Sequence, residues 1–329
     1  MLTIDFINVG YGDAILIQKT TGGQREFVML VDCGDLNTGK AYPGSQRVTA
    51  AQFLRDQGIN HLNLLVLTHL HLDHSGGLRH LLPGISIDEF WTNYLPPQEV
   101  WNRTLAVPDD LSSGARCLLH SMNTYLPALR EMHRQGTRMS RISGTTRQIM
   151  LCENLQLDVF GEEPGLYDRQ AQIWQNQFSG AADGGRLDEL DQFINNTSIR
   201  MRLTYRGSAV ELPGDVYASC WEMQDIAPCT VVKLPHHGHR DSYTERLSEM
   251  LRPQYVVVSV SNMRVDDCPS GLAVELARRA NAQLLFTDAV VRPGIVPAYH
   301  QAVRCMIDDQ GNCTVNSYHA GGDTTHEAV

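Results

Sequence analysis

The sequence predicts an α/β fold, and three observations support that prediction. Runs typical of strands alternate with runs of helical spacing along the 329 residues. The runs at 62–67 and 255–260 are almost entirely apolar, which is typical of strands buried on both faces. Hydrophobic residues make up 42% of the chain, enough to bury a substantial core. We therefore expect a single domain over residues 1–318.

The N-terminal part is predicted to begin with three strands. Residues 2–9 alternate as a strand does. A turn at residues 10–13 follows, and residues 14–18 and 27–31 are expected to pair as a hairpin across Thr-Thr-Gly-Gly-Gln.

The next predicted elements surround a group of histidines. Residues 47–57 have helical apolar spacing, with Gly58 just past the end. The strand at 62–67 leads into the histidine segment, a short helix follows at 77–82, and residues 87–94 form the next strand.

Two middle segments interrupt this alternation. Residues 95–147 open with two prolines and contain one or two helices at 111–135, which we interpret as a helical insertion. Residues 149–160 return to strands. Residues 161–192 are polar and rich in glycine, so we expect a long surface loop there.

The C-terminal part is predicted to alternate strands and helices again and to close with a hairpin. Residues 319–329 are expected to be a disordered tail. The predicted strands are 199–205, 209–212, 230–234, 255–260, 283–287, 303–307 and 313–317, and the predicted helices are 217–224, 242–251 and 271–280.

Composition excludes some classes of protein. The chain contains no apolar run of 18 residues and its N-terminus lacks the pattern of a signal peptide, so we expect no membrane association. A net charge of −10 argues against general adhesion to nucleic acid, although a local basic groove would be compatible with it. The eight cysteines form no C-x-x-C motif, and we expect reduced thiols in a cytoplasmic protein.

The segment Thr68-His69-Leu70-His71-Leu72-Asp73-His74-Ser75-Gly76-Gly77 is the strongest functional signal in the sequence. Four side chains able to bind metal fall within six residues, directly after a predicted buried strand. Imidazole and carboxylate together suit a borderline divalent ion. A single histidine at a strand end would be an ordinary turn residue, whereas this spacing predicts a metal site.

Three other predicted strands also end in residues of ligand type. Asp32 follows the strand at 27–31, where it could orient a ligand histidine. Asp215 follows the strand at 209–212 and is placed to bridge two ions. His236 and His237 follow the strand at 230–234. Each of these alone is weak evidence, but together they predict one composite site.

The order of these motifs resembles the metallo-β-lactamase fold, and within it the branch that contains the ComEC-type (ComEC/Rec2-like) DNA-uptake nuclease domain. The resemblance extends over nearly the full chain and implies an αββα sandwich with a dinuclear metal site at one sheet edge. The matching segments are N-V-G-Y-G-D-A at 8–14, which includes Asp13, V-D-C-G at 31–34, T-H-x-H-x-D-H-S-G-G at 68–77, N-N-T-S at 195–198, L-P-G-D at 212–215, K-L-P-H-H-G at 233–238 and V-S-V at 258–260.

The resemblance implies a role for each motif residue. His69 and His71 would bind one ion, Asp73 and His74 the second, Asp215 would bridge, and His236 would complete the second site. His237 would then face substrate phosphate, although the two adjacent histidines could exchange roles.

Around these ligands, the resemblance implies a supporting set. A superfamily histidine is replaced by Asn196 and Ser198, which slightly favours Mn²⁺ over Zn²⁺. Asp13 and Asp32 would support the ligands, and Ser242 is retained from the branch pattern. The chain departs from that pattern at His239 and Cys268, which stand where the branch has serine and histidine.

We expect from this a hydrolase in which two divalent ions, Zn²⁺ or Mn²⁺, hold a bridging hydroxide that attacks a phosphoester. Asp73 would orient the hydroxide, and His237 or His239 would assist at the phosphate or the leaving group. The substrate would be a phosphodiester, nucleic acid included. Two alternatives stay open: a hydrolase of a thioester or lactam, and a metal-binding regulatory protein with little turnover.

Overall fold

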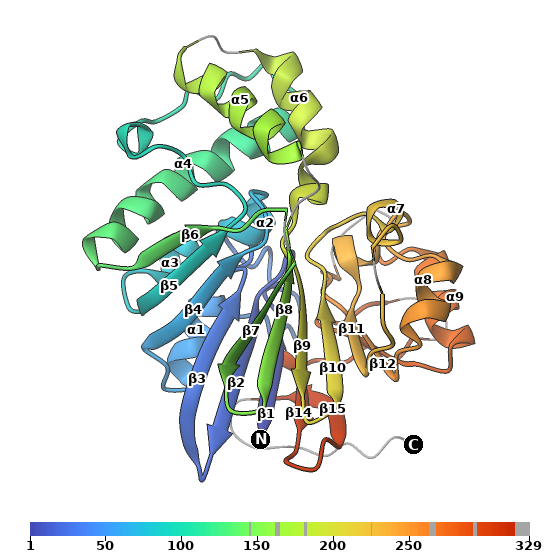
Figure 1. Ribbon diagram of the computed structural model, residues 1–329. Coiled ribbons are helices and arrows are strands. Elements are labelled where there is room, and N and C mark those ends of the chain that lie inside the picture. Colours follow the sequence, from blue (N-terminus) through green and yellow to red (C-terminus); the bar gives the residue numbers. More distant parts are fainter. Residues whose placement is uncertain are drawn as a thin grey trace.

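The computed structural model describes residues 1–144, 146–161, 165–180, 183–224, 226–262, 268–291 and 295–319. They form two β-sheets that face each other, with helices on both outer sides (Figure 1). One buried apolar cluster joins the sheets, since it contains Phe6 and Val31 from the first and Leu157 and Met201 from the second. Two further apolar clusters are present, one between the first sheet and its helices and one between the second sheet and its helices. This order of layers confirms the α/β class and fits the αββα sandwich.

The first sheet is predominantly N-terminal. Its strands β3, β4, β5 and β6 are parallel, so their carboxyl ends lie at one edge. The C-terminal hairpin joins the other side of this sheet, where β14 pairs with β1. In spatial order its strands are β15 (Cys313–Tyr318), β14 (Ala302–Ile307), β1 (Leu2–Ile7), β2 (Ile15–Thr21), β3 (Gln24–Val31), β4 (His61–Leu67), β5 (Ser86–Thr92) and β6 (Arg138–Arg141).

The second sheet contains the remaining strands in the described residues. Four of them, β10 to β13, are parallel, and their carboxyl ends also lie at one edge. In spatial order the strands are β13 (Gln283–Phe286), β12 (Tyr255–Val258), β11 (Val231–Lys233), β10 (Ser208–Leu212), β9 (Arg200–Tyr205), β8 (Leu155–Phe160) and β7 (Arg147–Cys152). Two sheet edges built from parallel carboxyl ends are therefore available for a composite site.

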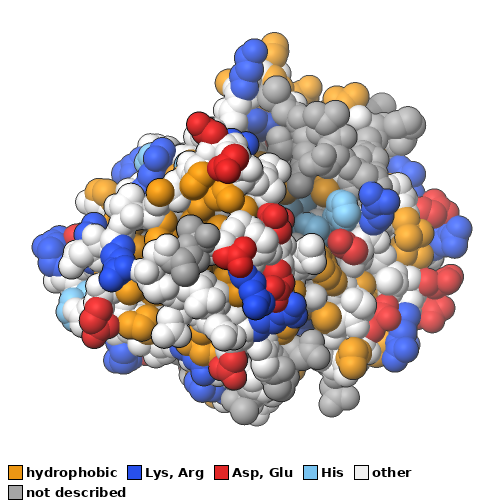
Figure 2. Space-filling view, turned by 90° about the horizontal axis from the view of Figure 1, so that it is seen from above, with side chains coloured by type: hydrophobic (Ala, Val, Ile, Leu, Met, Phe, Trp, Pro, Cys, Tyr) orange, Lys and Arg blue, Asp and Glu red, His pale blue; other side chains and the backbone are white. Residues whose placement is uncertain are grey.

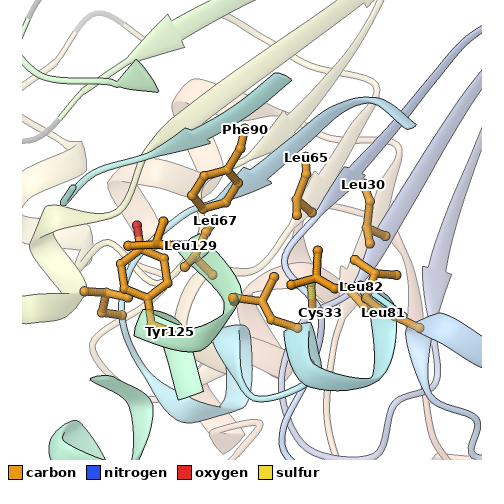
Figure 3. Packing of buried hydrophobic residues seen from close by; sticks show 14 of the residues in the cluster. Leu30, Cys33, Leu65, Leu67, Leu81, Leu82, Phe90, Tyr125 and Leu129 are labelled. Atoms are coloured by element: carbon orange, nitrogen blue, oxygen red, sulfur yellow. The ribbon is translucent and has the colours of Figure 1, made fainter. Parts of the chain in front are cut away.

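Helices cover the outer face of each sheet. On the first sheet, Leu30, Leu65 and Phe90 from the strands pack against Leu81 of α3 and Leu129 of α4 (Figure 3). On the second sheet, the outer cluster includes apolar side chains of α7, α8 and α9. The helices of these two layers are α1 (Ala50–Asp56), α2 (Leu72–Ser75), α3 (Leu78–Leu81), α4 (Ser113–Arg134), α7 (Ala218–Trp221), α8 (Glu245–Leu251) and α9 (Gly271–Arg279), with the 3-10 turn η1 at Gln98–Val100.

Helices occur both in the segment interpreted as an insertion and in the segment after it. Residues 95–147 contain the long helix α4 and the short strand β6. The loop expected at 161–192 is wrong, because α5 (Leu166–Phe178) and α6 (Gly184–Phe193) occupy most of it. Their outer positions are polar, but Trp174 and Leu190 are fully buried in the cluster that contains the apolar face of α4. That partner face is distant in the sequence, so the polar composition misled the prediction.

The remaining features concern the ends of the chain. Of the expected tail at 319–329, only His319 lies within the described residues. Among the helices of the described ranges, none is both long and apolar enough to cross a bilayer.

Candidate metal centre

The histidine loop, residues 68–77, lies at the carboxyl end of β4 and contains α2. Its two glycines are required by close packing. An added Cβ at Gly77 would lie 2.0 Å from the carbonyl oxygen of Cys33, and one at Gly76 would lie 2.4 Å from the amide nitrogen of Leu36. The backbone of Cys33 also donates to the carbonyl oxygen of His74, at 2.8 Å. The two glycines of the Ser-Gly-Gly ending therefore allow this loop to pack closely against the turn that follows β3.

Asp32 holds the histidine loop from that turn. One carboxylate oxygen accepts from the backbone amide of Thr68, and the other accepts from the Thr68 hydroxyl, both at 2.8 Å. The second oxygen also lies 2.8 Å from Nδ1 of His74. Burial raises the pKa of Asp32, although His74 opposes this shift. The structure therefore places Asp32 where the sequence analysis expects it, orienting a candidate ligand.

The first group of candidate ligand atoms comes from the histidine loop and the end of β10. Nε2 of His69 lies 3.2 Å from Nδ1 of His71, and Nε2 of His74 lies 3.2 Å from Oδ2 of Asp215. Single ligand atoms of His69, His74 and Asp215 all lie within 4.8 Å of one another. Burial, together with the charges of His74 and His71, holds the pKa of His69 well below its usual value, so its ring is neutral and available as a ligand.

The second group adds a residue from the end of β11. Nε2 of His237 lies 3.1 Å from Oδ2 of Asp73 and 3.3 Å from Oδ2 of Asp215. Ligand atoms of Asp73, His74 and His237 also lie within 4.8 Å of one another. Asp215 belongs to the first group together with His69 and also lies 3.3 Å from His237 of the second, so it stands between the two groups.

The sequence analysis expects His236 as the ligand of the second ion, but it is the ring of His237 that lies beside Asp73 and Asp215. Both residues have left-handed backbone conformations, with φ of +47° and +54°. This turn, η3 (Pro235–Gly238), buries the ring of His237 completely, whereas the side chain of His236 is 19% exposed. Nδ1 of His236 contacts Asp241 at 2.9 Å instead of the Asp73 and Asp215 carboxylates. Of the two adjacent histidines, whose roles the sequence left open to exchange, His237 is therefore the one that lies with the other candidate ligands.

His236, His239 and Asp241 form a second cluster beside the first. Nδ1 of His239 lies 3.1 Å from the same Asp241 oxygen that contacts His236. Burial by itself would raise the pKa of Asp241, but the two histidines outweigh it and lower that pKa. Figure 2 shows histidine side chains exposed on this end of the molecule. The cluster of His236, His239 and Asp241, which we call the mouth cluster, presents partly exposed imidazoles, since the side chains of His236 and His239 are 19% and 24% exposed.

The serine and asparagine of the N-N-T-S motif support the site from η2 (Ile194–Thr197) and the residue after it. Ser198 Oγ accepts from the backbone amide of Asp215 at 3.1 Å and lies 3.3 Å from Nδ1 of His69. Asn196 accepts from the backbone amide of Tyr217. Both therefore position neighbouring residues. The adjacent Asn195 was not singled out from the sequence, yet its Nδ2 lies 3.4 Å from Nε2 of His236.

Of two further predicted residues, Ser242 supports the turn at 236–239, and Cys268 lies in apolar packing close in sequence to Ser270, which also contacts the turn. Ser242 is fully buried and donates through its hydroxyl to the carbonyl oxygen of His239. Cys268 is buried in the apolar cluster on the outer side of the second sheet. Two residues later, Ser270 donates through its backbone amide to the carbonyl oxygen of Gly238.

Asp13 and Lys233 complete the charge balance at the centre. Lys233 is fully buried and forms ion pairs with Asp13 and Asp215. Burial by itself would lower the pKa of Lys233, but the charges of Asp13 and Asp215 outweigh it and raise that pKa. The sequence analysis includes Lys233 only within the K-L-P-H-H-G motif and predicts no role for it. Its position at the end of the apolar strand β11 is the signal that could have predicted a buried lysine beside the site.

These residues have the chemistry of a site for divalent cations. Asp13, Asp32, Asp73 and Asp215 surround the imidazoles, and one oxygen of Asp13 is buried without a hydrogen-bond partner. Burial by itself would lower the pKa of His74, but the carboxylates outweigh it and raise that pKa well above its usual value, as they also raise the pKa of His237. A site that draws protons onto buried imidazoles has the negative potential that a metal cation satisfies.

The N-terminal part of the chain matches a known family. Residues 7–92 match the family model described as the Metallo-beta-lactamase superfamily, and they include the Asp32 turn and the whole histidine loop. Members of that superfamily are metal-dependent hydrolases. The superfamily named from the sequence is thus supported over a little more than a quarter of the chain, while the ComEC-type branch stays a prediction. No curated protein sequence matches the chain.

Several solved structures are similar to this one. The metallo-β-lactamase fold protein YhfI from Bacillus subtilis has 10% sequence identity and a TM-score of 0.44, with 91% of this chain and 100% of that chain covered. Isothiocyanate hydrolase from Delia radicum gut bacteria has 12% identity and a TM-score of 0.44, with coverage of 96% and 99%. Zn²⁺-bound PqqB from Methylobacterium extorquens has 11% identity and a TM-score of 0.43, with coverage of 86% and 97%.

Proposed function

We propose that this chain is a metal-dependent hydrolase that cleaves a phosphodiester with the help of two divalent cations, Zn²⁺ or Mn²⁺. One observation carries the proposal. Side chains from three distant segments, the histidine loop, Asp215 and His237, converge within hydrogen-bond distance of one another in a buried cluster. No packing requirement explains so many buried imidazoles and carboxylates, whereas cation binding does.

The ligand assignment follows from which atoms face each other. His69 Nε2 and His71 Nδ1 would hold the first cation, and His74 Nε2 and His237 Nε2 would hold the second together with Asp73. Asp215 would contact both. The cations, when bound, would acidify a water molecule and withdraw charge from a phosphate oxygen.

The protein's own residues would prepare the substrate and the water. The carboxylates of Asp73 and Asp215 lie beside His237 and would accept hydrogen bonds from the attacking water. The mouth cluster would contact the phosphate: in their protonated forms His236 and His239 would each donate from Nε2 to its oxygens, while Asp241 lies beside Nδ1 of both rings. The role first expected of His237 therefore passes to His236.

The mouth cluster favours a phosphoester over a carbonyl substrate. Two protonated imidazoles beside one carboxylate would each present an Nε2–H to an anion, and a phosphodiester keeps its negative charge throughout the reaction. A nucleic acid and a small phosphodiester both meet this requirement.

The eight cysteines are free thiols, which fits the reducing cytoplasm.

A metal-reconstitution assay tests this function. The protein is stripped with a chelator, reloaded with Mn²⁺ or Zn²⁺, and assayed on bis(p-nitrophenyl) phosphate, on single-stranded DNA and RNA, and on an ester and lactam panel. We expect phosphodiester cleavage that the double variant His69→Ala/His71→Ala abolishes. The matched control is His80→Ala, because His80 is an exposed histidine on α3. Full activity in the double variant, or faster turnover of the esters and lactams, would overturn the proposal.

A further inference from the structure

The inserted helices lie directly above the histidine loop, and they are joined to it by specific contacts. Helix α4 contacts the loop through the hydroxyl of Ser121, which lies 2.7 Å from the hydroxyl of Ser75. Helix α6 in turn packs on the first turns of α4, where Ser112, the N-cap residue, donates to Asp188. Buried leucines of α6 belong to the same apolar cluster as the inner face of α4. The insertion is therefore fixed relative to the candidate ligands.

Asp191 of α6 extends from this insertion to the first ligand group. Its Oδ1 lies 3.5 Å from Nε2 of His71, and the opposite ring nitrogen of His71, Nδ1, faces Nε2 of His69 at 3.2 Å. A carboxylate beside Nε2 favours the tautomer that carries its proton there. That tautomer leaves the Nδ1 lone pair directed at the place where the first cation would bind.

Gly114 of α4 provides the space for this carboxylate. An added Cβ at Gly114 would lie 2.2 Å from Oδ2, 2.5 Å from Cγ and 2.9 Å from Oδ1 of Asp191. All three distances are shorter than real Cβ contacts, so any larger residue at position 114 would displace the carboxylate from His71. The glycine on α4 and the aspartate on α6 thus form a pair.

We propose that Asp191 is a positioning residue for His71, supplied by the insertion and accommodated by Gly114. The inference rests on the proposed function, because it requires a cation at His69 and His71. His74 has the equivalent partner in Asp32, which belongs to the sandwich itself. Each cation would then have one ligand histidine oriented by a carboxylate, the second from the sandwich and the first from the insertion.

The test measures metal affinity. Zn²⁺ is titrated into the full-length, metal-free protein in competition with a chromophoric chelator, which resolves the dissociation constants of both ions. We expect Asp191→Asn to raise the dissociation constant of one ion by about 10- to 100-fold and to leave that of the other ion unchanged. A loss of this size is usual when the carboxylate partner of a ligand histidine is removed. Gly114→Ala should weaken the same ion, although it retains Asp191 and replaces glycine with a better helix former.

Two controls keep the test decisive. Asp188→Asn removes a carboxylate from the same helix that contacts Ser112 and not His71, and it should leave both dissociation constants unchanged. The unfolding midpoint measured in chelator should be the same for wild type and Asp191→Asn. Wild-type affinity in Asp191→Asn, or equal losses in Asp191→Asn and Asp188→Asn, would overturn the inference while the proposed function stands. A wild-type protein that binds no Zn²⁺, or a His71→Ala variant that keeps both ions, would overturn both.

Discussion

Replacing the two adjacent histidines one at a time should produce opposite results, although their sequence positions differ by one. His237 is fully buried, with its Nε2 3.1 Å from Asp73 and 3.3 Å from Asp215. In metal-free protein its raised pKa makes it the cationic partner of both carboxylates. Loss of one partner from a buried ion pair costs about 3–5 kcal/mol, so His237→Ala should lower the free energy of unfolding by that amount. It should also lose one of the two proposed ions.

His236→Ala should behave quite differently. Its partner Asp241 is 36% exposed and His236 is 19% exposed, so the pair is screened by solvent and contributes about 1 kcal/mol at most. Both ions should be retained, and the loss should appear in phosphodiester turnover. Urea unfolding in chelator and elemental analysis of the reloaded proteins measure the two effects. A His236→Ala protein that loses an ion, beside a His237→Ala protein that keeps both, would refute the assignment of His237 as the ligand.

Two further predictions concern Asp32 and His300. Asp32→Asn should weaken binding of the second ion by about 10- to 100-fold in the same chelator competition, because it removes the negative charge beside His74 Nδ1 and leaves one acceptor oxygen for the groups of Thr68 and His74 that Asp32 contacts. Asparagine tolerates the φ of +56° at this position, so the backbone should keep its conformation in the variant. Unchanged metal affinity would therefore contradict the prediction. Burial lowers the pKa of His300 from 6.5 to about 4, so the unfolded chain binds more protons than the folded protein between these values, and stability is lost as pH falls through that window. Between pH 7 and pH 5 wild type should lose about 2 kcal/mol more than His300→Gln in urea unfolding, and equal losses would exclude His300 as the source.

The sequence analysis was most accurate where a single segment carries its own signal. The histidine loop could be predicted as a candidate metal site because its four metal-capable residues lie within six positions after an apolar strand. Asp32 and Asp215 could be predicted for a related reason. Both follow strands that run parallel within their sheets, and the carboxyl ends of such strands lie at one edge.

The errors arose where the outcome depends on distant partners. The helices α5 and α6 were taken for a loop because their outer positions are polar, and the apolar face of α4 that covers Trp174 and Leu190 is remote in the sequence. Asp191 was missed for the same reason. In the sequence, an aspartate on a polar helix cannot be told from a solvated surface residue. Only the folded structure shows that Oδ1 of Asp191 lies 3.5 Å from Nε2 of His71.

The sequence by itself determined the chemical types at the centre and the strand ends that present them, because both depend on short-range pattern. The tertiary structure alone decided which of two adjacent histidines faces inward and that a lysine could be buried beside them. Two successive left-handed residues turn His237 toward Asp73 and leave His236 at the surface. Lys233 is stable in the interior because Asp215 and also Asp13, which lies 220 positions earlier in the turn between β1 and β2, form ion pairs with its ammonium group.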